Sequence, residues 1–123
     1  MPTILVLDDD QVILDLLQTV LTDAGHETIL APEVGRIPPE ARVDLVITDL
    51  VPLKAYRRES ALAWVASLRT RFGDSPLLII TAHAPAGAEP DMLGANAVMT
   101  KPFDVEALLA TIEELLNHIR KTP

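Results

Sequence analysis

Near its start the chain passes from an apolar segment directly into acidic residues. Ile4 to Leu7 are aliphatic, Asp8 to Asp10 are three aspartates, and a helical pattern begins immediately afterwards. A short apolar run with such abrupt ends is typical of a buried strand in a parallel sheet, and ligands bind beyond the carboxyl ends of such strands. Clustered carboxylates repel one another unless a cation compensates. Alone, the triplet fits either a metal site or a solvated turn in which Asp10 caps a helix.

Strand-like and helix-like segments alternate along the rest of the chain. Apolar residues recur at helical spacing after Asp10, with Gly25 as the expected stop, and again in a middle helix that ends at Gly73. A loop is expected from Val51 to Glu59 before that helix, and Asp104 is the expected N-cap of the last one. The predicted strands cover residues 4–7, 27–30, 43–48, 77–80 and 95–99.

This alternation predicts an α/β protein with one doubly wound sheet of five parallel strands in the flavodoxin-like order 2-1-3-4-5. The second and fourth helices are expected to be short, because Pro38-Pro39 and the prolines at 85 and 90 interrupt them. Residues 1–123 are expected to form a single domain with no output domain. In that strand order the binding crevice lies between the ends of the first and third strands.

Composition excludes several classes of protein. The chain has 123 residues, of which 49% are hydrophobic, so it can bury a core. It has no cysteine, which excludes disulfides and thiolate chemistry. Its net charge of −8 disfavours nucleic acid as a partner. No segment is long and apolar enough to span a membrane, and no signal peptide is evident, so a cytoplasmic protein is expected.

Polar residues stand at the expected carboxyl end of four strands. Asp8 and Asp9 follow the first strand, Asp49 follows the third, Thr81 the fourth and Lys101 the fifth. Three carboxylates suit a hard divalent cation such as Mg²⁺, while a hydroxyl and an ammonium group suit a phosphoryl group. A carboxylate can itself be the nucleophile and form an aspartyl phosphate. Together these residues predict phosphoryl transfer at this edge of the sheet.

These residues are similar in order and spacing to the receiver domain of two-component response regulators. The resemblance extends from about Thr3 to the end of the last helix. It is carried by ILVLDDD at residues 4–10, DLVITDL at 44–50, IITA at 79–82 and GANAVMTKPF at 94–103. The family resemblance implies a receiver-like fold and a role in phosphorelay signalling.

The resemblance also implies roles for the acidic residues. Asp49 is expected to accept a phosphoryl group from a histidine kinase or a histidine phosphotransfer protein. Asp8 and Asp9, together with Asp49, are expected to hold the Mg²⁺, with the backbone carbonyl of Val51 as a further ligand. Phosphorylation then alters binding to a downstream effector or a fused output domain. The chain is thus expected to be a phosphoacceptor and not an enzyme in the usual sense.

The resemblance assigns the remaining two site residues as well, and it shows where the chain departs from the family. Thr81 is expected to contact the phosphoryl oxygens and Lys101 to pair with them, with the Lys101-Pro102 bond in cis. The family usually has proline four residues after the acceptor, whereas Pro52 is three residues after Asp49. Val98 occupies the position of the family's aromatic switch residue, so a switch between Thr81 and an aromatic ring cannot operate in its usual form.

Two other functions compete with the phosphoacceptor reading. The sequence DDDQV at residues 8–12 fits the Asp-x-Asp-x-Val signature of haloacid-dehalogenase-type phosphatases, with Asp8 as nucleophile and Asp10 as acid, but the second acidic motif of those enzymes is missing. Alternatively, the altered acceptor loop and the missing aromatic residue suit a receiver that signals by binding partners without phosphorylation. Labelling at Asp49 supports the phosphoacceptor, and turnover of a small phosphomonoester supports the phosphatase.

Overall fold

Five parallel strands form the sheet, and their order is the predicted β2-β1-β3-β4-β5. The computed structural model describes residues 2–38, 40, 42–49, 58–81, 95–101 and 103–121. Every pairing between neighbouring strands is parallel, so all five carboxyl ends lie at one edge of the sheet. The strands are β1 (Thr3–Leu7), β2 (Glu27–Ala31), β3 (Leu45–Thr48), β4 (Leu77–Thr81) and β5 (Ala97–Thr100).

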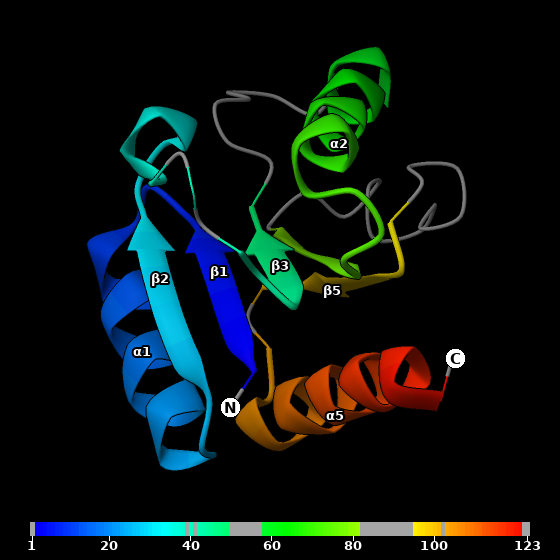
Figure 1. Cartoon of the computed structure of the whole chain (residues 1–123). Helices are drawn as coiled ribbons and strands as arrows, with labels where there is room; N and C mark the ends of the chain where they lie inside the picture. Colours follow the sequence, from blue (N-terminus) through cyan, green and yellow to red (C-terminus); the bar gives the residue numbers. More distant parts are fainter. Residues whose placement is uncertain are drawn as a thin grey trace.

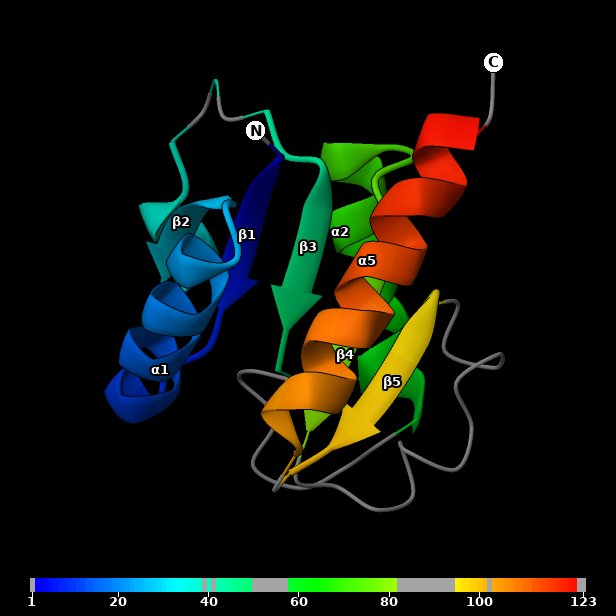
Figure 2. The same ribbon diagram turned by 90° about the horizontal axis from the view of Figure 1, so that it is seen from below.

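Helices cover both faces of this sheet. Helices α1 (Gln11–Asp23) and α5 (Val105–Lys121) pack on one face, and α2 (Arg58–Phe72) packs on the other (Figures 1 and 2). In Figure 2 the strand arrows point the same way, and α1 and α5 lie in front of the sheet with α2 behind it. This is the doubly wound arrangement that the alternation of strands and helices predicts.

Alternation of side chains along the strands divides the core into two layers. Successive residues of a strand point to opposite faces, so Leu5 and Val46 face α2, whereas Ile4 and Ile47 face α1 and α5. The strands β3 and β4 are buried along their whole length, as expected for the centre of a parallel sheet. The helical members of the α1–α5 layer are Leu14, Leu17, Leu21, Leu108, Ile112 and Leu116.

The ends of the helices agree with the sequence signals. The Asp10 side chain accepts a hydrogen bond from the Val12 backbone N–H at 2.9 Å, so Asp10 is the N-cap of α1. Gly25 and Gly73 follow α1 and α2 with φ of +90° and +61°, a region that favours glycine. Helix α5 begins directly after Asp104, whose carbonyl accepts from the Leu108 N–H.

Three elements begin two residues away from their predicted starts, and the other strand bounds agree with the predictions to within one residue. Strand β3 begins at Leu45 instead of Val43, because Asp44 instead binds the backbone N–H of Thr3 through its carboxylate at 2.7 Å. Helix α2 already begins at Arg58, within the predicted loop. Strand β5 is shifted toward the C-terminus, and Asn96 before it accepts a hydrogen bond from the Leu77 backbone.

The second helix is short, as predicted, and consists of a single 3₁₀ turn at Val34–Arg36. The segment expected to hold the short fourth helix lies outside the described residues, as do Val51 and Pro102. Within the described part of the chain, none of the helices has the length and apolar character needed to cross a bilayer.

Candidate functional site

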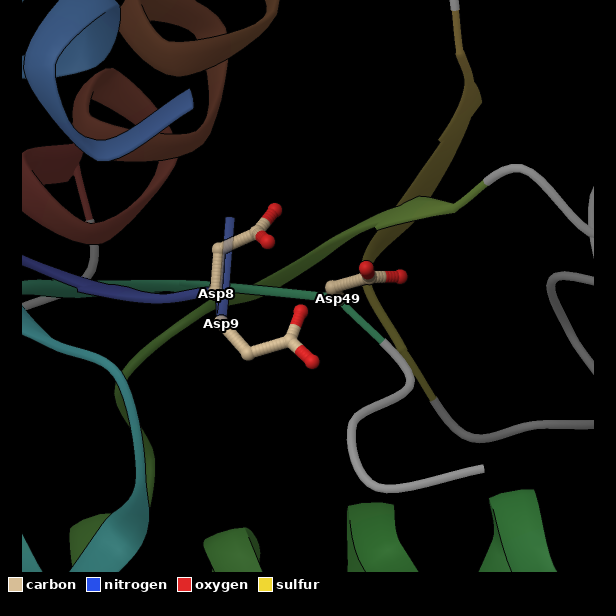
Figure 3. A group of neighbouring side chains, drawn as sticks. All are labelled: Asp8, Asp9 and Asp49. Atoms are coloured by element: carbon tan, nitrogen blue, oxygen red, sulfur yellow. The ribbon is translucent and has the colours of Figure 1, made fainter. Parts of the chain in front are cut away.

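Three aspartates meet where β1 and β3 end side by side. Leu7 and Thr48 are partners in the register of these strands, so the residues that follow them are neighbours. The backbone N–H of Asp49 donates to the Leu7 carbonyl at 2.9 Å, which extends the pairing past the end of β3. Figure 3 shows the carboxylates of Asp8, Asp9 and Asp49 around this point, and one oxygen from each lies within 4.8 Å of the others.

Asp8 and Asp9 are adjacent in sequence but differ in surroundings. Asp8 is buried, with 3% of its surface exposed, while Asp9 is exposed. Their side chains leave the end of β1 in different directions (Figure 3). The Asp8 carboxylate accepts a hydrogen bond from the backbone N–H of Asp10 at 2.9 Å through Oδ1. Asp8 is therefore fixed by the fold, whereas Asp9 presents its carboxylate to solvent.

Lys101 links the two strands that carry the aspartates. It follows β5, which is separated from β3 by β4, and its long side chain crosses that distance. Its ammonium group donates to Asp8 Oδ2 at 2.9 Å and to Asp49 Oδ2 at 3.0 Å. The backbone N–H of Lys101 donates to the Thr81 carbonyl at 2.8 Å, which holds the start of the side chain at the end of β4.

Burial and pairing shift the pKa values of two of these groups. Burial of Asp8 disfavours its ionised form and raises its pKa, although the hydrogen bonds from the Asp10 backbone and from Lys101 oppose the shift. For Lys101, burial is the largest influence and favours the neutral amine. The hydrogen bonds to Asp8 and Asp49, together with the negative charges of these carboxylates, outweigh it and raise the Lys101 pKa. The lysine therefore stays charged and partly compensates three clustered carboxylates.

The structure brings most of the predicted site residues to one edge. Asp8, Asp9, Asp49 and Lys101 are in one cluster, and Thr81 is the buried last residue of β4, the strand next to β3. The backbone of Val51, predicted as a metal ligand, lies outside the described residues. Asp10 contributes its carboxylate to the helix cap, in agreement with the second of the two readings of the triplet.

Two polar links were not predicted from the sequence. Trp64 of α2 donates its indole N–H to the Thr48 hydroxyl at 3.0 Å, directly behind Asp49. His26 is buried at the opposite end of the sheet, where its Nε2 lies 3.2 Å from Glu113 Oε1. A tryptophan N–H and a threonine hydroxyl inside an apolar layer both need partners, and this requirement is the signal that could have found the first link.

The donor set of the cluster suits a hard cation. All three candidate ligands are carboxylates, and Mg²⁺ prefers oxygen ligands and keeps part of its water shell. Lys101 alone leaves the cluster with an excess of formal negative charge, which a divalent cation would neutralise. The residues present therefore fit Mg²⁺.

Comparison with known proteins identifies the family. The family model described as the response regulator receiver domain matches residues 4–113. The chain therefore belongs to the response regulator receiver domain family. Membership assigns it to two-component signal transduction, in which receiver domains act as phosphoacceptors, and it confirms the resemblance found in the sequence.

Individual relatives are consistent with this assignment. The chain is 32% identical to the DNA-binding dual master transcriptional regulator RpaA of Synechocystis, over 100% of this chain and 52% of that protein. It is 32% identical to the DNA-binding transcriptional regulator NtrC of Azospirillum brasilense, over 94% of this chain and 24% of that protein. The chain thus spans about half the length, or less, of these curated relatives.

Solved structures show the same fold. A receiver domain protein from Methanospirillum hungatei superimposes with a TM-score of 0.78, at 24% identity, over 100% of this chain and 99% of that one. The Vibrio cholerae chemotaxis protein CheY4 superimposes with a TM-score of 0.71, at 27% identity, over 94% and 98% of the two chains. The predicted receiver-like fold is confirmed.

Proposed function

We propose that Asp49 accepts a phosphoryl group in a Mg²⁺-dependent reaction and that the modified chain then changes its binding to a downstream partner. The observation that carries this proposal is the pair of hydrogen bonds from Lys101 to Asp49 and Asp8. The ammonium group of Lys101 thus holds the acceptor Asp49 beside the candidate metal ligand Asp8. The side chain of Asp49 is 20% exposed, so a donor can reach its carboxylate.

The chemistry follows from these positions. One oxygen of the Asp49 carboxylate forms a bond to phosphorus as the bond from phosphorus to the donor breaks, and the electron pair of that bond leaves with the donor. Lys101 then pairs with a phosphoryl oxygen, and the Thr81 hydroxyl donates to another. Mg²⁺ held by Asp8, Asp9 and Asp49, with the Val51 carbonyl, supplies charge neutralisation when it is bound.

The proposed donor is a histidine kinase or a histidine phosphotransfer protein, as the family implies. The receiver domain occupies the whole of residues 1–123 in this proposal and acts in the cytoplasm. Its partner after phosphorylation is an effector protein or an output domain. Two of the relatives, RpaA and NtrC, are DNA-binding regulators. In our proposal this chain itself does not contact DNA, because its net charge of −8 disfavours binding to phosphate groups.

The position of Asp10 argues against the phosphatase hypothesis. That reading needs Asp10 as a general acid, but Asp10 Oδ1 accepts a hydrogen bond from the Val12 N–H and caps α1. Its carboxylate is thus already engaged at the start of the helix. The same geometry suits a receiver, in which Asp10 has no part in the chemistry.

Labelling with a small phosphodonor tests the proposal. The wild-type chain and Asp49→Asn are each incubated with acetyl phosphate and Mg²⁺, and intact mass is recorded with time. We expect one phosphoryl group on the wild type, none on Asp49→Asn and none on wild type when the metal is chelated. Catalytic turnover of a phosphomonoester would instead support the phosphatase. Partner binding that is equal with and without beryllofluoride would support a receiver that signals without phosphorylation.

A further inference from the structure

A partly buried chain of two hydrogen bonds, which we call the relay, connects helix α2 to the backbone of the acceptor. The indole N–H of Trp64 donates to the Thr48 hydroxyl at 3.0 Å, and that hydroxyl donates to the Asp49 carbonyl at 2.6 Å. Both distances lie within the normal ranges for their donors. Thr48 is fully buried, and its neighbours along β3 are aliphatic. Its hydroxyl is thus a polar group placed at the end of an apolar strand.

The direction of both bonds is fixed by the donors available. An indole N–H can only donate, so the Thr48 oxygen must accept from Trp64. The hydroxyl has a single proton, and the Asp49 carbonyl receives it. Neither bond can reverse, and a buried hydroxyl without partners would be unfavourable. The relay therefore has one arrangement in the native fold.

The relay adds a further restraint on Asp49. Its backbone N–H is bonded to the Leu7 carbonyl, its carboxylate to Lys101, and its own carbonyl to Thr48. Phosphoryl transfer depends mainly on positioning, and small displacements of the reacting group slow it strongly. The carbonyl bond fixes the peptide group at the point where the chain leaves β3. It therefore also fixes the direction in which the acceptor side chain projects.

We propose that Thr48 and Trp64 are positioning residues for the acceptor: Trp64 orients the Thr48 hydroxyl, which in turn holds the backbone of Asp49. The proposal rests on the function proposed above for Asp49. It gives α2 a hydrogen-bonded connection to the acceptor through Thr48, in addition to the apolar contacts of this helix with the sheet. Trp64 is also the single tryptophan of the chain, so its fluorescence reports on the surroundings of this side chain without a contribution from another indole.

Rates of labelling by acetyl phosphate test the order of the relay. Thr48→Val removes the hydroxyl with little change of shape and is expected to slow labelling roughly three- to tenfold, the worth of one hydrogen bond. Trp64→Phe removes the N–H donor together with part of the indole ring, and it is expected to slow labelling less than Thr48→Val. The double variant should be labelled no more slowly than Thr48→Val, since the indole acts through the hydroxyl. Thr48→Ser, which keeps the hydroxyl, should restore a rate near that of the wild type.

Two controls separate positioning from stability. Val65→Ala removes buried volume from α2 without touching the relay, so it should lower the free energy of unfolding and leave the labelling rate unchanged. Trp64 emission should change when Mg²⁺ and beryllofluoride are added to the wild type, and this change should be lost in Thr48→Val. If Thr48→Val and Trp64→Phe are both labelled at the wild-type rate, the positioning role of the relay is wrong, while the proposed function of Asp49 stands. A wild-type chain that is never labelled would overturn the proposed function and the positioning role with it.

Discussion

The interior of the sheet and its carboxyl edge are built on opposite principles. In the interior, aliphatic side chains from β1, β3 and β4 pack against the helices, and each buried residue favours the folded state. At the edge, three carboxylates are gathered around one lysine, and burial raises the pKa of Asp8. The interior holds the fold together, whereas the edge holds charges that the fold alone does not require.

This contrast separates residues that stabilise from residues that function. A binding site often carries groups that cost stability until the ligand is present. Removal of an interior residue should then reduce stability without changing the chemistry of the molecules that remain folded. Removal of an edge residue should change metal binding or phosphorylation more than stability. Four substitutions test the contrast, in order of decreasing effect on the free energy of unfolding.

The largest loss of stability is expected in the interior. Ile112 of α5 is fully buried between the helix and the sheet, so Ile112→Ala should lower the free energy of unfolding by about 2–5 kcal/mol. Urea denaturation measures this loss. The labelling rate per folded molecule should equal that of the wild type, and a strongly reduced rate would mean that the interior and the edge are not separate.

Loss of the lysine should have an intermediate effect. Lys101→Met leaves the clustered carboxylates without their cation and should lower the free energy of unfolding by about 1–3 kcal/mol in the absence of metal. Because the hydrogen bond from Lys101 lowers the Asp8 pKa, that pKa should rise further. Added Mg²⁺ should recover part of the loss, as followed by thermal unfolding with and without the ion. Lys101→Arg serves as the control that keeps the charge.

Asp10 lies beside the site but is assigned a structural role. Asp10→Ala removes the N-cap of α1 and should cost about 1 kcal/mol of stability, while Asp10→Ser, which can still cap, should cost less. Neither change should alter Mg²⁺ affinity or labelling. A large loss of metal affinity in Asp10→Ser, measured by titration, would return Asp10 to the metal site.

Asp8 should show the contrast most clearly, with little effect on stability. Burial raises the Asp8 pKa above its ordinary value of 3.8, so in the pH range just above 3.8 the folded chain binds more protons than the unfolded chain. The contribution of Asp8 to the free energy of unfolding therefore falls as the pH rises from 3.8 through the raised pKa. Asp8→Asn should therefore leave metal-free stability at neutral pH unchanged or higher. The Mg²⁺ affinity of Asp8→Asn should fall by more than roughly 10- to 100-fold, which is the loss expected when a group that only hydrogen-bonds a metal ligand is removed.

The wild-type metal affinity should also depend on pH. Protons compete with Mg²⁺ for the Asp8 carboxylate, and the raised pKa means that this competition begins at a higher pH than for an ordinary aspartate. Titrations of the wild type and Asp8→Asn at several pH values measure the effect. If acidification lowers the Mg²⁺ affinity equally steeply in the wild type and in Asp8→Asn, the proton that competes with the metal binds to a group other than Asp8.

Much of the fold was predictable because its signals are local. The apolar runs at Ile4–Leu7 and Leu77–Ile80 could only be short buried segments, and Gly25 and Gly73 mark helix ends. The start of β3 was wrong because Asp44 bonds to the distant Thr3, a contact that no local pattern encodes.

The candidate site was predictable for a related reason. In a parallel sheet the residues that follow each strand meet at one edge, so Asp8, Asp49 and Lys101 could be grouped before any distance was known. The different surroundings of the site residues could not be predicted from the sequence. Burial of Asp8 but not Asp9, and the bond from Trp64 to Thr48, depend on how α2 and the strand ends pack in three dimensions.

Chemical trapping of the labelled residue tests the central claim most directly. The wild-type chain is phosphorylated with acetyl phosphate and Mg²⁺ and reduced with borohydride, which converts an aspartyl phosphate to homoserine, and the modified peptide is sequenced by mass spectrometry. The account predicts homoserine at position 49, with the aspartates of the 8–10 segment unchanged. Homoserine at position 8 would contradict it and would instead place the nucleophile on the first strand.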